Sequence, residues 1–250
     1  MIKLENTEVL GWEAAIRGMR NPMNSWNKSD SAIQHGDDYW AITNEADQNI
    51  SENFIIEQIT KGLFYDACYI GPNDHKLMMN LAKTGSVDAK FRRMIVVTVD
   101  ITAPLYWWKE FDTYKVGTVA NSCSTMHKIH SKEFTLEDFS CEHLDSILHK
   151  VRIADESLID ISSKDVLNDV VRALNLYREL FLATKDKAYW WQMIQLLPSS
   201  YNQCRTVMLN YEVLASQYRQ RKDHKLDCWR EYCGWIESLP YSEIITLEET

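Results

Sequence analysis

The stretch 93-RMIVVTVDI-101 decides the fold class, because it is the strongest β-strand pattern in the chain. Six of its nine residues are Ile, Val or Thr, and such β-branched side chains pack well on the pleated surface of a sheet. The segment that follows, 104-PLYWWKEFDTY-114, begins with a proline, which is well tolerated in the first turn of a helix. We therefore expect a buried strand followed directly by an aromatic helix.

Helical periodicity predicts most of the remaining structure. The pattern is clearest at Ser163–Ala183, where apolar residues recur along one face. A short edge strand is expected over Met1–Glu5 and a long polar loop over Asn24–Asn49. Further helices are expected over Val9–Met19, over Ser51–Gly62, from an Asn73 cap to about Gly85, over Ser200–Arg221 and over Leu226–Ser238. The fold class is α/β or α+β, with helices predominating.

Composition indicates an ordinary globular protein. Hydrophobic residues make up 45% and charged residues 25% of the 250 positions, with only 5 Pro and 8 Gly. This balance suits a single domain over 1–250, in which 128–162 is a variable elaboration. No apolar run approaches the roughly 20 residues of a membrane helix, and the N-terminus lacks the layout of a secretory signal. We expect a cytoplasmic protein without membrane contacts.

Charge and cysteine spacing exclude several classes of function. The net charge of −9 disfavours binding to long nucleic acid, although a small anion can still bind in a local basic pocket. The six cysteines include no CxxC pair, which is typical of reduced thiols. The histidines of 127–149 and Cys141 invite a metal site, but the His127–His130 spacing stands alone. We predict no bound metal.

Two tryptophan pairs, Trp107-Trp108 and Trp190-Trp191, are conspicuous. Adjacent residues of a helix point about 100° apart, so neither pair can form a single stacking platform. We expect core packing to dominate, with one member of each pair in the core and the other at an interface.

The expected helix over Ser200–Arg221 carries a stripe of candidate binding residues. At helical spacing, one face collects Asn210, Leu214, Gln217 and Arg221. Carboxamides donate and accept, as the edge of a pyrimidine or flavin ring requires, and a guanidinium presents a planar fork to oxygen atoms. A solvated helix face is the alternative interpretation.

Leu197-Pro198, followed by Asn210 and Arg221, resembles the C-terminal motif of the flavin-dependent thymidylate synthases. A strand ending in Ala103-Pro104 and an aromatic helix resemble an earlier region of that family. The resemblance covers about 85–127 and 189–236. It implies the family's fold, a central mixed sheet with a helical bundle.

The resemblance also implies an activity. Enzymes of this family transfer a one-carbon unit from methylenetetrahydrofolate to C5 of dUMP, and FAD reduced by NADPH delivers hydride. They work as homotetramers. A similar protein would be a methyltransferase that binds a pyrimidine nucleotide.

The same resemblance assigns substrate-binding residues. Arg221 would be the catalytic residue, orienting the pyrimidine and stabilising negative charge that develops on it. Ser124 would lie near the nucleotide. Gln217 and Gln195 are further substrate-binding candidates, Gln195 because it stands close to Ile194, which replaces an arginine of the family.

The cofactor end departs from the family pattern. Thr113-Tyr114-Lys115 stands where the family has an Arg-His-Arg triplet that helps to bind FAD, and Thr118 replaces a serine. By this resemblance the cofactor-binding residues are Lys115, Tyr114, Thr118 and Asn210. A single cation remains of the three, and a lysine does not reproduce the bidentate contacts of arginine.

The missing cations could be supplied from elsewhere in the chain. Arg17 and Arg20 stand beside an Asn21-Pro22 turn that can fix them near a phosphate. Arg92-Arg93 is a second basic pair, and either pair could equally form surface salt bridges. Two alternative functions remain open: a different modification, such as hydroxymethylation or use of dCMP, and non-catalytic nucleotide binding on the same fold.

Overall fold

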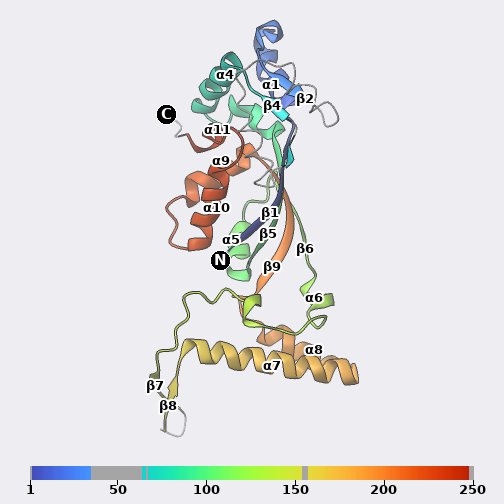
Figure 1. The fold of residues 1–250 in the computed structure, drawn as a ribbon, viewed down its shortest axis with the longest axis vertical. Coiled ribbons are helices and arrows are strands. Elements are labelled where there is room, and N and C mark those ends of the chain that lie inside the picture. Colours follow the sequence, from blue (N-terminus) through green and yellow to red (C-terminus); the bar gives the residue numbers. More distant parts are fainter. Residues whose placement is uncertain (1, 35–63, 66, 154–156, 248–250) are drawn as a thin grey trace. The chain divides into compact units, whose positions relative to one another are not determined.

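The computed structural model describes residues 2–34, 64–65, 67–153 and 157–247 (Figure 1). The helix expected over Ser51–Gly62 lies outside these residues, as does much of the loop expected over Asn24–Asn49. Among the described residues, no helix combines the length and the apolar character that crossing a bilayer requires.

The chain forms two compact units. The hairpin unit consists of Thr102–Glu110 and Ser122–Cys204. The sheet unit consists of Ile2–Ile101, Phe111–Asn121 and the chain from Arg205 onward. The single domain expected over 1–250 stays a prediction.

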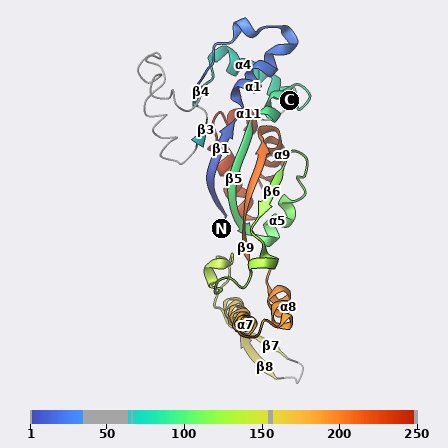
Figure 2. The same cartoon turned by 90° about the vertical axis from the view of Figure 1, so that its right-hand side faces the viewer.

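A five-stranded sheet has the strand order β3-β1-β5-β9-β6 (Figure 2). Its strands are β1 (Lys3–Leu10), β3 (Phe64–Tyr65), β5 (Val96–Pro104), β6 (Val119–Ser122) and β9 (Asn202–Asn210). Strands β1 and β3 are parallel. Asn6 of β1 is hydrogen-bonded to Asp100 of β5, and Glu8 of β1 is hydrogen-bonded to Thr98 of β5. The partner on β5 moves backward as β1 moves forward, so the two strands are antiparallel. The expected mixed sheet is confirmed.

Strand β5 buries one of its two faces. Val97, Val99 and Ile101 are buried, while Thr98 and Asp100 between them are partly exposed. This is the period of two that a half-buried strand requires. In the sheet unit, α9 (Tyr211–Arg221), α10 (Asp227–Glu237) and α11 (Glu243–Thr246) lie on one side of the strands (Figure 1).

The N-terminal part of the sheet unit is built around α1 (Trp12–Arg20) and α4 (Pro72–Lys83). Both helices pack against the 3-10 helix η4 (Ala89–Met94), which leads into β5. The connecting segment contains η1 (Asn21–Met23) and η2 (Trp26–Lys28), and then β2 (Ala32–Gln34), which pairs antiparallel with β4 (Ala67–Tyr69).

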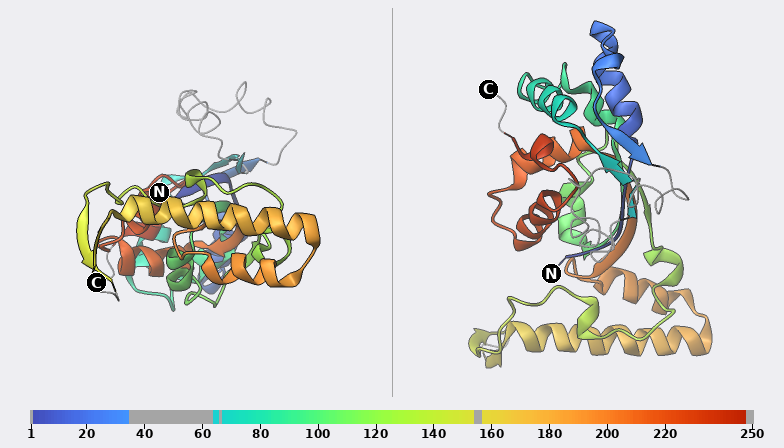
Figure 3. Two further views of the ribbon diagram at one scale, coloured as in Figure 1. Left: turned by 90° about the horizontal axis from the view of Figure 1, so that it is seen from below. Right: turned by 45° about the horizontal axis from the view of Figure 1, so that its top comes forward.

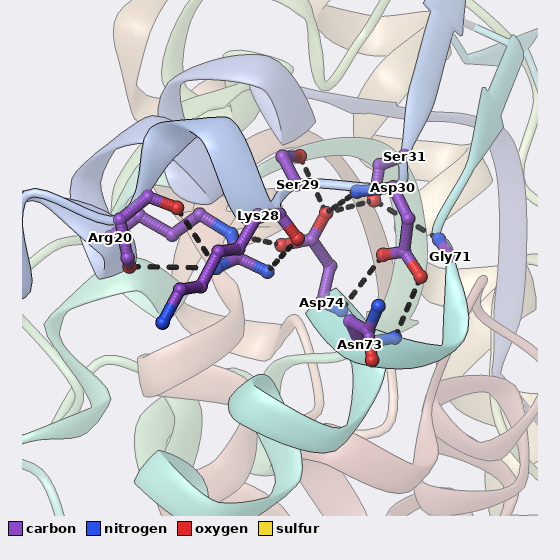
Figure 4. A network of polar contacts seen from close by, with 9 residues as sticks. Arg20, Lys28, Ser29, Asp30, Ser31, Gly71, Asn73 and Asp74 are labelled. Atoms are coloured by element: carbon purple, nitrogen blue, oxygen red, sulfur yellow. Dashed lines mark hydrogen bonds and ion pairs between the residues drawn. The ribbon is translucent and has the colours of Figure 1, made fainter.

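A buried ion pair ties this connecting segment to α4 (Figure 4). Arg20 Nε donates to Asp74 Oδ1 at 2.5 Å, and its terminal nitrogens donate to the carbonyls of Ser25 and Lys28. Asp74 Oδ2 accepts from the hydroxyls of Ser29 and Ser31 and from the amide of Asp30.

The Asp74 carboxylate is strongly stabilised by these contacts. Burial alone would raise the pKa of Asp74, but the hydrogen bonds from Ser29, Ser31, Arg20 and the Asp30 amide together lower it below its usual value. Arg20 and Asp74 are both almost fully buried. The pair therefore fixes the segment between α1 and β2.

The hairpin unit is dominated by two helices that lie side by side, α7 (Ser163–Thr184) and α8 (Lys187–Leu196) (Figure 3). They share a core formed by Ile129, Phe134, Phe139, Leu167, Leu174 and Met193. The smaller elements of the region are α5 (Leu105–Phe111), α6 (Thr125–Lys128), η5 (Leu136–Asp138), β7 (His149–Arg152) and β8 (Leu158–Ile161). Part of the expected elaboration over 128–162 thus supplies core residues, and β7 and β8 form an antiparallel hairpin.

One predicted element was wrong in type. The helix expected over Ser200–Arg221 is a strand, β9, followed by a helix, α9. Val207 and Leu209 are buried and Thr206 and Met208 are exposed, which is the alternation of a strand. Hydrogen bonding to neighbouring strands overrode a local composition that also suits a helix.

Other expectations were wrong in their boundaries. Strand β1 lies between β3 and β5 and is no edge strand. Pro104 ends β5 instead of opening a helix. The N-cap of α4 is Gly71, not Asn73, and the carboxylate of Asp30 accepts from the amides of Asn73 and Asp74 in the first turn. The helices α7 and α10 are confirmed nearly to the residue.

The first tryptophan pair is packed in the core, as expected, but without the expected interfacial member. Trp107 and Trp108 are both buried, so neither is exposed for an interface, and Trp108 Nε1 donates to the carbonyl of Gln203. Trp190 is half-buried and Trp191 is 44% exposed.

We expect Gly11→Ala to destabilise the protein by at least about 2 kcal/mol in urea unfolding. Gly11 has φ +93, and a Cβ there would lie 2.1 Å from the carbonyl oxygen of Met94. Gly234→Ala is the matched control, because a Cβ added there would meet nothing within 4 Å and its helix should gain up to about 1 kcal/mol. Equal effects of the two substitutions would contradict the packing described at Gly11.

We expect Asp74→Asn to lower the unfolding free energy at neutral pH by about 3–5 kcal/mol, because it leaves a buried guanidinium without its counter-charge. The folded-state pKa of Asp74 is lowered, so this stability is present above the usual value of 3.8 and is lost as the pH falls through the lowered pKa. The difference between wild type and variant should therefore shrink only below pH 3.8.

The control for that measurement is Arg17→Gln. Arg17 pairs with Glu13 on the exposed face of α1, and such a pair contributes about 1 kcal/mol or less. If Asp74→Asn lowers the unfolding free energy no more than Arg17→Gln does, the ion pair does not hold the segment between α1 and β2.

Candidate functional site

A pocket of about 390 Å³ lies in the sheet unit. It is lined by Phe111, Asp112, Tyr114, Lys115, Thr118 and Ala120. Three of the four expected cofactor-binding residues, Tyr114, Lys115 and Thr118, thus line one cavity. Its volume falls at the small end of the range for ligand sites, about 300–1,000 Å³.

Gly117 sets the course of the segment that forms the pocket. It has φ +78, and a Cβ there would meet Asn210 Nδ2 and Val213 Cγ2 at 3.1 Å. The segment after α5 therefore lies directly against the N-terminal end of α9, and a residue without a side chain is what allows this approach.

The pocket combines charged and neutral polar groups. Lys115 supplies an exposed cation. The hydroxyl of Thr118 is buried and has no hydrogen-bond partner within the described residues, which leaves it able to donate to or accept from a ligand. Asp112 accepts a hydrogen bond at 2.7 Å from Arg205 of β9.

Arg205 is a cation that the sequence pattern did not point to. The expected replacement cations were the N-terminal arginines and Arg92-Arg93, and the stretch that contains Arg205 was expected to be helical. As part of a strand, Arg205 is brought beside the pocket through Asp112. The sequence over 202–210 gives no clear strand signal, because the buried Gln203 is polar and the exposed Met208 is apolar, so apolar and polar residues do not alternate.

Arg221 lies between two aromatic rings at the end of α9. Its Cζ is 4.6 Å from the ring centroid of Trp229 and 5.7 Å from that of Tyr114. Its Nε donates to the Tyr114 hydroxyl at 2.9 Å. Since Tyr114 lines the pocket, the expected catalytic residue is in direct contact with one of the expected cofactor residues.

The other members of the expected helical stripe have different roles. Asn210 is the N-cap of α9, and its Oδ1 accepts from the amides of Glu212 and Val213. Gln217 is fully buried, and its Oε1 accepts from the Tyr232 hydroxyl at 2.7 Å. The four residues do not form one exposed stripe, because Asn210 precedes the helix and Leu214 and Gln217 face the core.

Ser124 and Gln195 belong to the hairpin unit. Ser124 is the N-cap of α6, with its Oγ accepting from the amide of His127 at 3.1 Å. Gln195 is exposed on α8. Gln203 fixes the segment around Ser124, since its Nε2 donates to the carbonyl of Cys123 and to the hydroxyl of Thr125.

Of the four arginines expected to replace the missing cations, three have partners within the fold, and Arg93 is exposed. Arg20 is engaged with Asp74 and two carbonyls, and Arg17 is exposed beside Glu13. Arg92 is buried within 3.5 Å of Glu212. A phosphate at Arg20 would have to displace the buried Asp74 carboxylate, so Arg20 is not part of the proposed site. Arg17 as a substrate-binding residue stays a prediction. Among the described residues, no cluster of His, Cys, Asp and Glu is arranged to hold a metal ion.

No protein-family model and no curated protein matches this chain. Solved structures do match it along nearly their whole length. The flavin-dependent thymidylate synthase ThyX from Helicobacter pylori, complexed with FAD and dUMP, is 14% identical, with 98% of each chain covered and a TM-score of 0.60. A second structure of ThyX from that organism, with the same two ligands, gives a TM-score of 0.61 at 14% identity, covering 99% of this chain and 98% of the other.

The UMP/dUMP methylase PolB from Streptomyces cacaoi, bound with 5-Br dUMP, is a further match. It is 13% identical, with 95% of this chain and 89% of the other covered and a TM-score of 0.50. Likeness at these identities concerns the backbone. The chain therefore has the mixed helix-and-sheet fold of the flavin-dependent thymidylate synthases.

Proposed function

We propose that this protein is an enzyme that modifies a pyrimidine nucleotide with the help of a flavin. In this proposal dUMP is the substrate, and a one-carbon unit is transferred to its C5 from methylenetetrahydrofolate. The observation that carries the proposal is the contact between Arg221 and Tyr114, which joins the expected substrate residue to the pocket. The likeness to structures solved with FAD and dUMP supports it.

Arg221 binds the pyrimidine end of the nucleotide in this proposal. A guanidinium offers planar, charged donors that match the carbonyl oxygens of a uracil ring. One-carbon transfer to C5 requires electron density to build up on the ring and its oxygens. A fixed cation beside those oxygens lowers the energy of that state more than that of the ground state.

The pocket residues fit a phosphate-bearing cofactor. Lys115 supplies a positive charge, and the unpartnered hydroxyl of Thr118 can donate to an oxygen. Tyr114 contributes an aromatic wall. Asn210 does not line the pocket, and its Oδ1 caps α9, but a Cβ added at Gly117 of the pocket segment would lie 3.1 Å from its Nδ2. Bound FAD would supply the hydride for the transferred group, and NADPH would be its reductant.

In this scheme the protein's own residues bind and orient the nucleotide and the cofactor. The Asp112–Arg205 pair is neutral as a whole, so Lys115 sets the sign of the pocket. A single net positive charge makes a weaker phosphate site than an Arg-His-Arg triplet would. We therefore expect FAD to bind less tightly than the nucleotide. Ser124 and Gln195 as substrate residues, and assembly as a homotetramer, stay predictions.

We expect the purified protein to be yellow and to release FAD on heating, and we expect dUMP to bind in calorimetry. Arg221→Ala should weaken dUMP binding by about 1.5–3 kcal/mol, the range for a hydrogen bond to a charged group. Arg219→Ala, which removes an exposed guanidinium from the same helix, is the control. Colourless protein that takes up no FAD even with dUMP present would contradict the flavin part, and equal losses for both arginines would contradict the role of Arg221.

The pocket itself is tested through Lys115. Lys115→Ala should weaken FAD binding about three- to tenfold, with a larger effect at low salt because the contact is partly exposed. Lys109→Ala removes an exposed lysine of α5 that does not line the pocket. FAD titrations that give the same affinity for wild type and Lys115→Ala would place the cofactor elsewhere.

A further inference from the structure

Arg221 is held in one orientation before any ligand binds. The guanidinium lies over the ring of Trp229, with Cζ 4.6 Å from its centroid, and the ring of Tyr114 is 5.7 Å away. A cation over an aromatic face is attracted by the ring quadrupole. The hydrogen bond from Nε to the Tyr114 hydroxyl then fixes the rotation of the guanidinium about this stack.

The Tyr114 hydroxyl is itself fixed in direction. It accepts from Arg221 Nε at 2.9 Å and lies 3.0 Å from Gln220 Oε1, to which it donates. With one bond accepted and one donated, the hydroxyl has a single favourable orientation. The ring of the same residue lines the pocket.

Trp229 forms a rigid wall behind Arg221. It is fully buried and packs edge-to-face against Tyr232, with ring centroids 5.6 Å apart. Burial raises the pKa of Tyr232 well above its usual value, so the hydroxyl keeps its proton and donates to Gln217. The buried Gln217, expected to bind substrate, thus helps to hold the aromatic wall in place.

We propose that Tyr114 is a positioning residue that acts through Arg221 to preorganise the nucleotide site. The inference rests on the proposed function, in which Arg221 binds the pyrimidine. A free arginine side chain loses much rotamer freedom when it binds a ligand. Holding it beforehand reduces that loss, and so strengthens binding without any contact between Tyr114 and the nucleotide.

The first experiment needs no ligand. In protein labelled with [15N]arginine, the Nε–H resonance of Arg221, assigned by its absence from Arg221→Ala, should exchange slowly with solvent. Tyr114→Phe removes only the hydroxyl and should speed that exchange at least about tenfold, since the bond to Nε is lost. Tyr218→Phe is the matched control. It also removes a tyrosine hydroxyl, one that lies on α9 with Arg221 but donates to Glu237 instead of accepting from Arg221.

The second experiment measures dUMP affinity in a double-mutant cycle. Tyr114→Phe alone should weaken binding about three- to tenfold. In an Arg221→Ala background the same substitution should have no further effect, because its action passes through the guanidinium. Tyr218→Phe should leave the affinity unchanged.

The outcomes separate the inference from the proposed function. An unchanged rate of Nε–H exchange in Tyr114→Phe shows that Tyr114 does not hold Arg221, and so overturns the inference whatever the protein binds. Equal weakening of dUMP binding by Tyr114→Phe in both backgrounds, or by Tyr218→Phe, overturns the positioning role. If the wild-type protein shows slow Nε–H exchange but binds no dUMP, the proposed function is contradicted, and so is the role of Tyr114 in nucleotide binding.

Discussion

The sheet unit depends on the double pairing of β5. Its side chain Asp100 accepts hydrogen bonds from Thr206 of β9 and from Asn6 of β1, and these bonds hold the pKa of Asp100 below its usual value. With both edges occupied, β5 can satisfy its backbone only within the sheet. Its buried Val and Ile side chains then require apolar cover, which fixes the side on which helices pack.

The candidate site follows from this arrangement. Strand β9 pairs with β5 and runs directly into α9, with Asn210 capping the helix. Gly117 lets the pocket segment lie against that helix end. Three turns later α9 delivers Arg221, which Tyr114 meets from the pocket segment. A cap, a glycine and one hydroxyl therefore connect two stretches that are about a hundred residues apart in sequence.

The two ends of the site differ in how firmly they are built. Arg221 is held by an aromatic stack and a hydrogen bond, whereas Lys115 is exposed. Tyr114 occupies a position where the resembling family carries a basic triplet. It adds no charge for a phosphate, but it fixes the guanidinium that would contact the pyrimidine. In the proposed site, Tyr114 would therefore act on the substrate side as well as forming a wall of the cofactor pocket.

Sequence by itself determined the elements whose local pattern is unambiguous. The β-branched run of β5 and the long apolar stripe of α7 can be recognised from the sequence of each segment alone, because a period of 2 or 3.6 is visible within that segment. The resemblance carried by Ala103-Pro104, Leu197-Pro198 and Arg221 predicted the fold, and it placed Tyr114, Lys115 and Thr118 together before their pocket was known.

Tertiary structure alone decided the rest. Residues 202–210 became a strand because β5 and β6 offer hydrogen bonds that a helix would have taken from its own chain. Arg20 became a structural residue because Asp74, 54 positions away, neutralises it in a buried place. Gln217 became part of the core because Tyr232 satisfies its carbonyl oxygen. Polar residues look alike in sequence whether they bind ligands or pair internally, since the partner that decides between the two lies elsewhere in the chain.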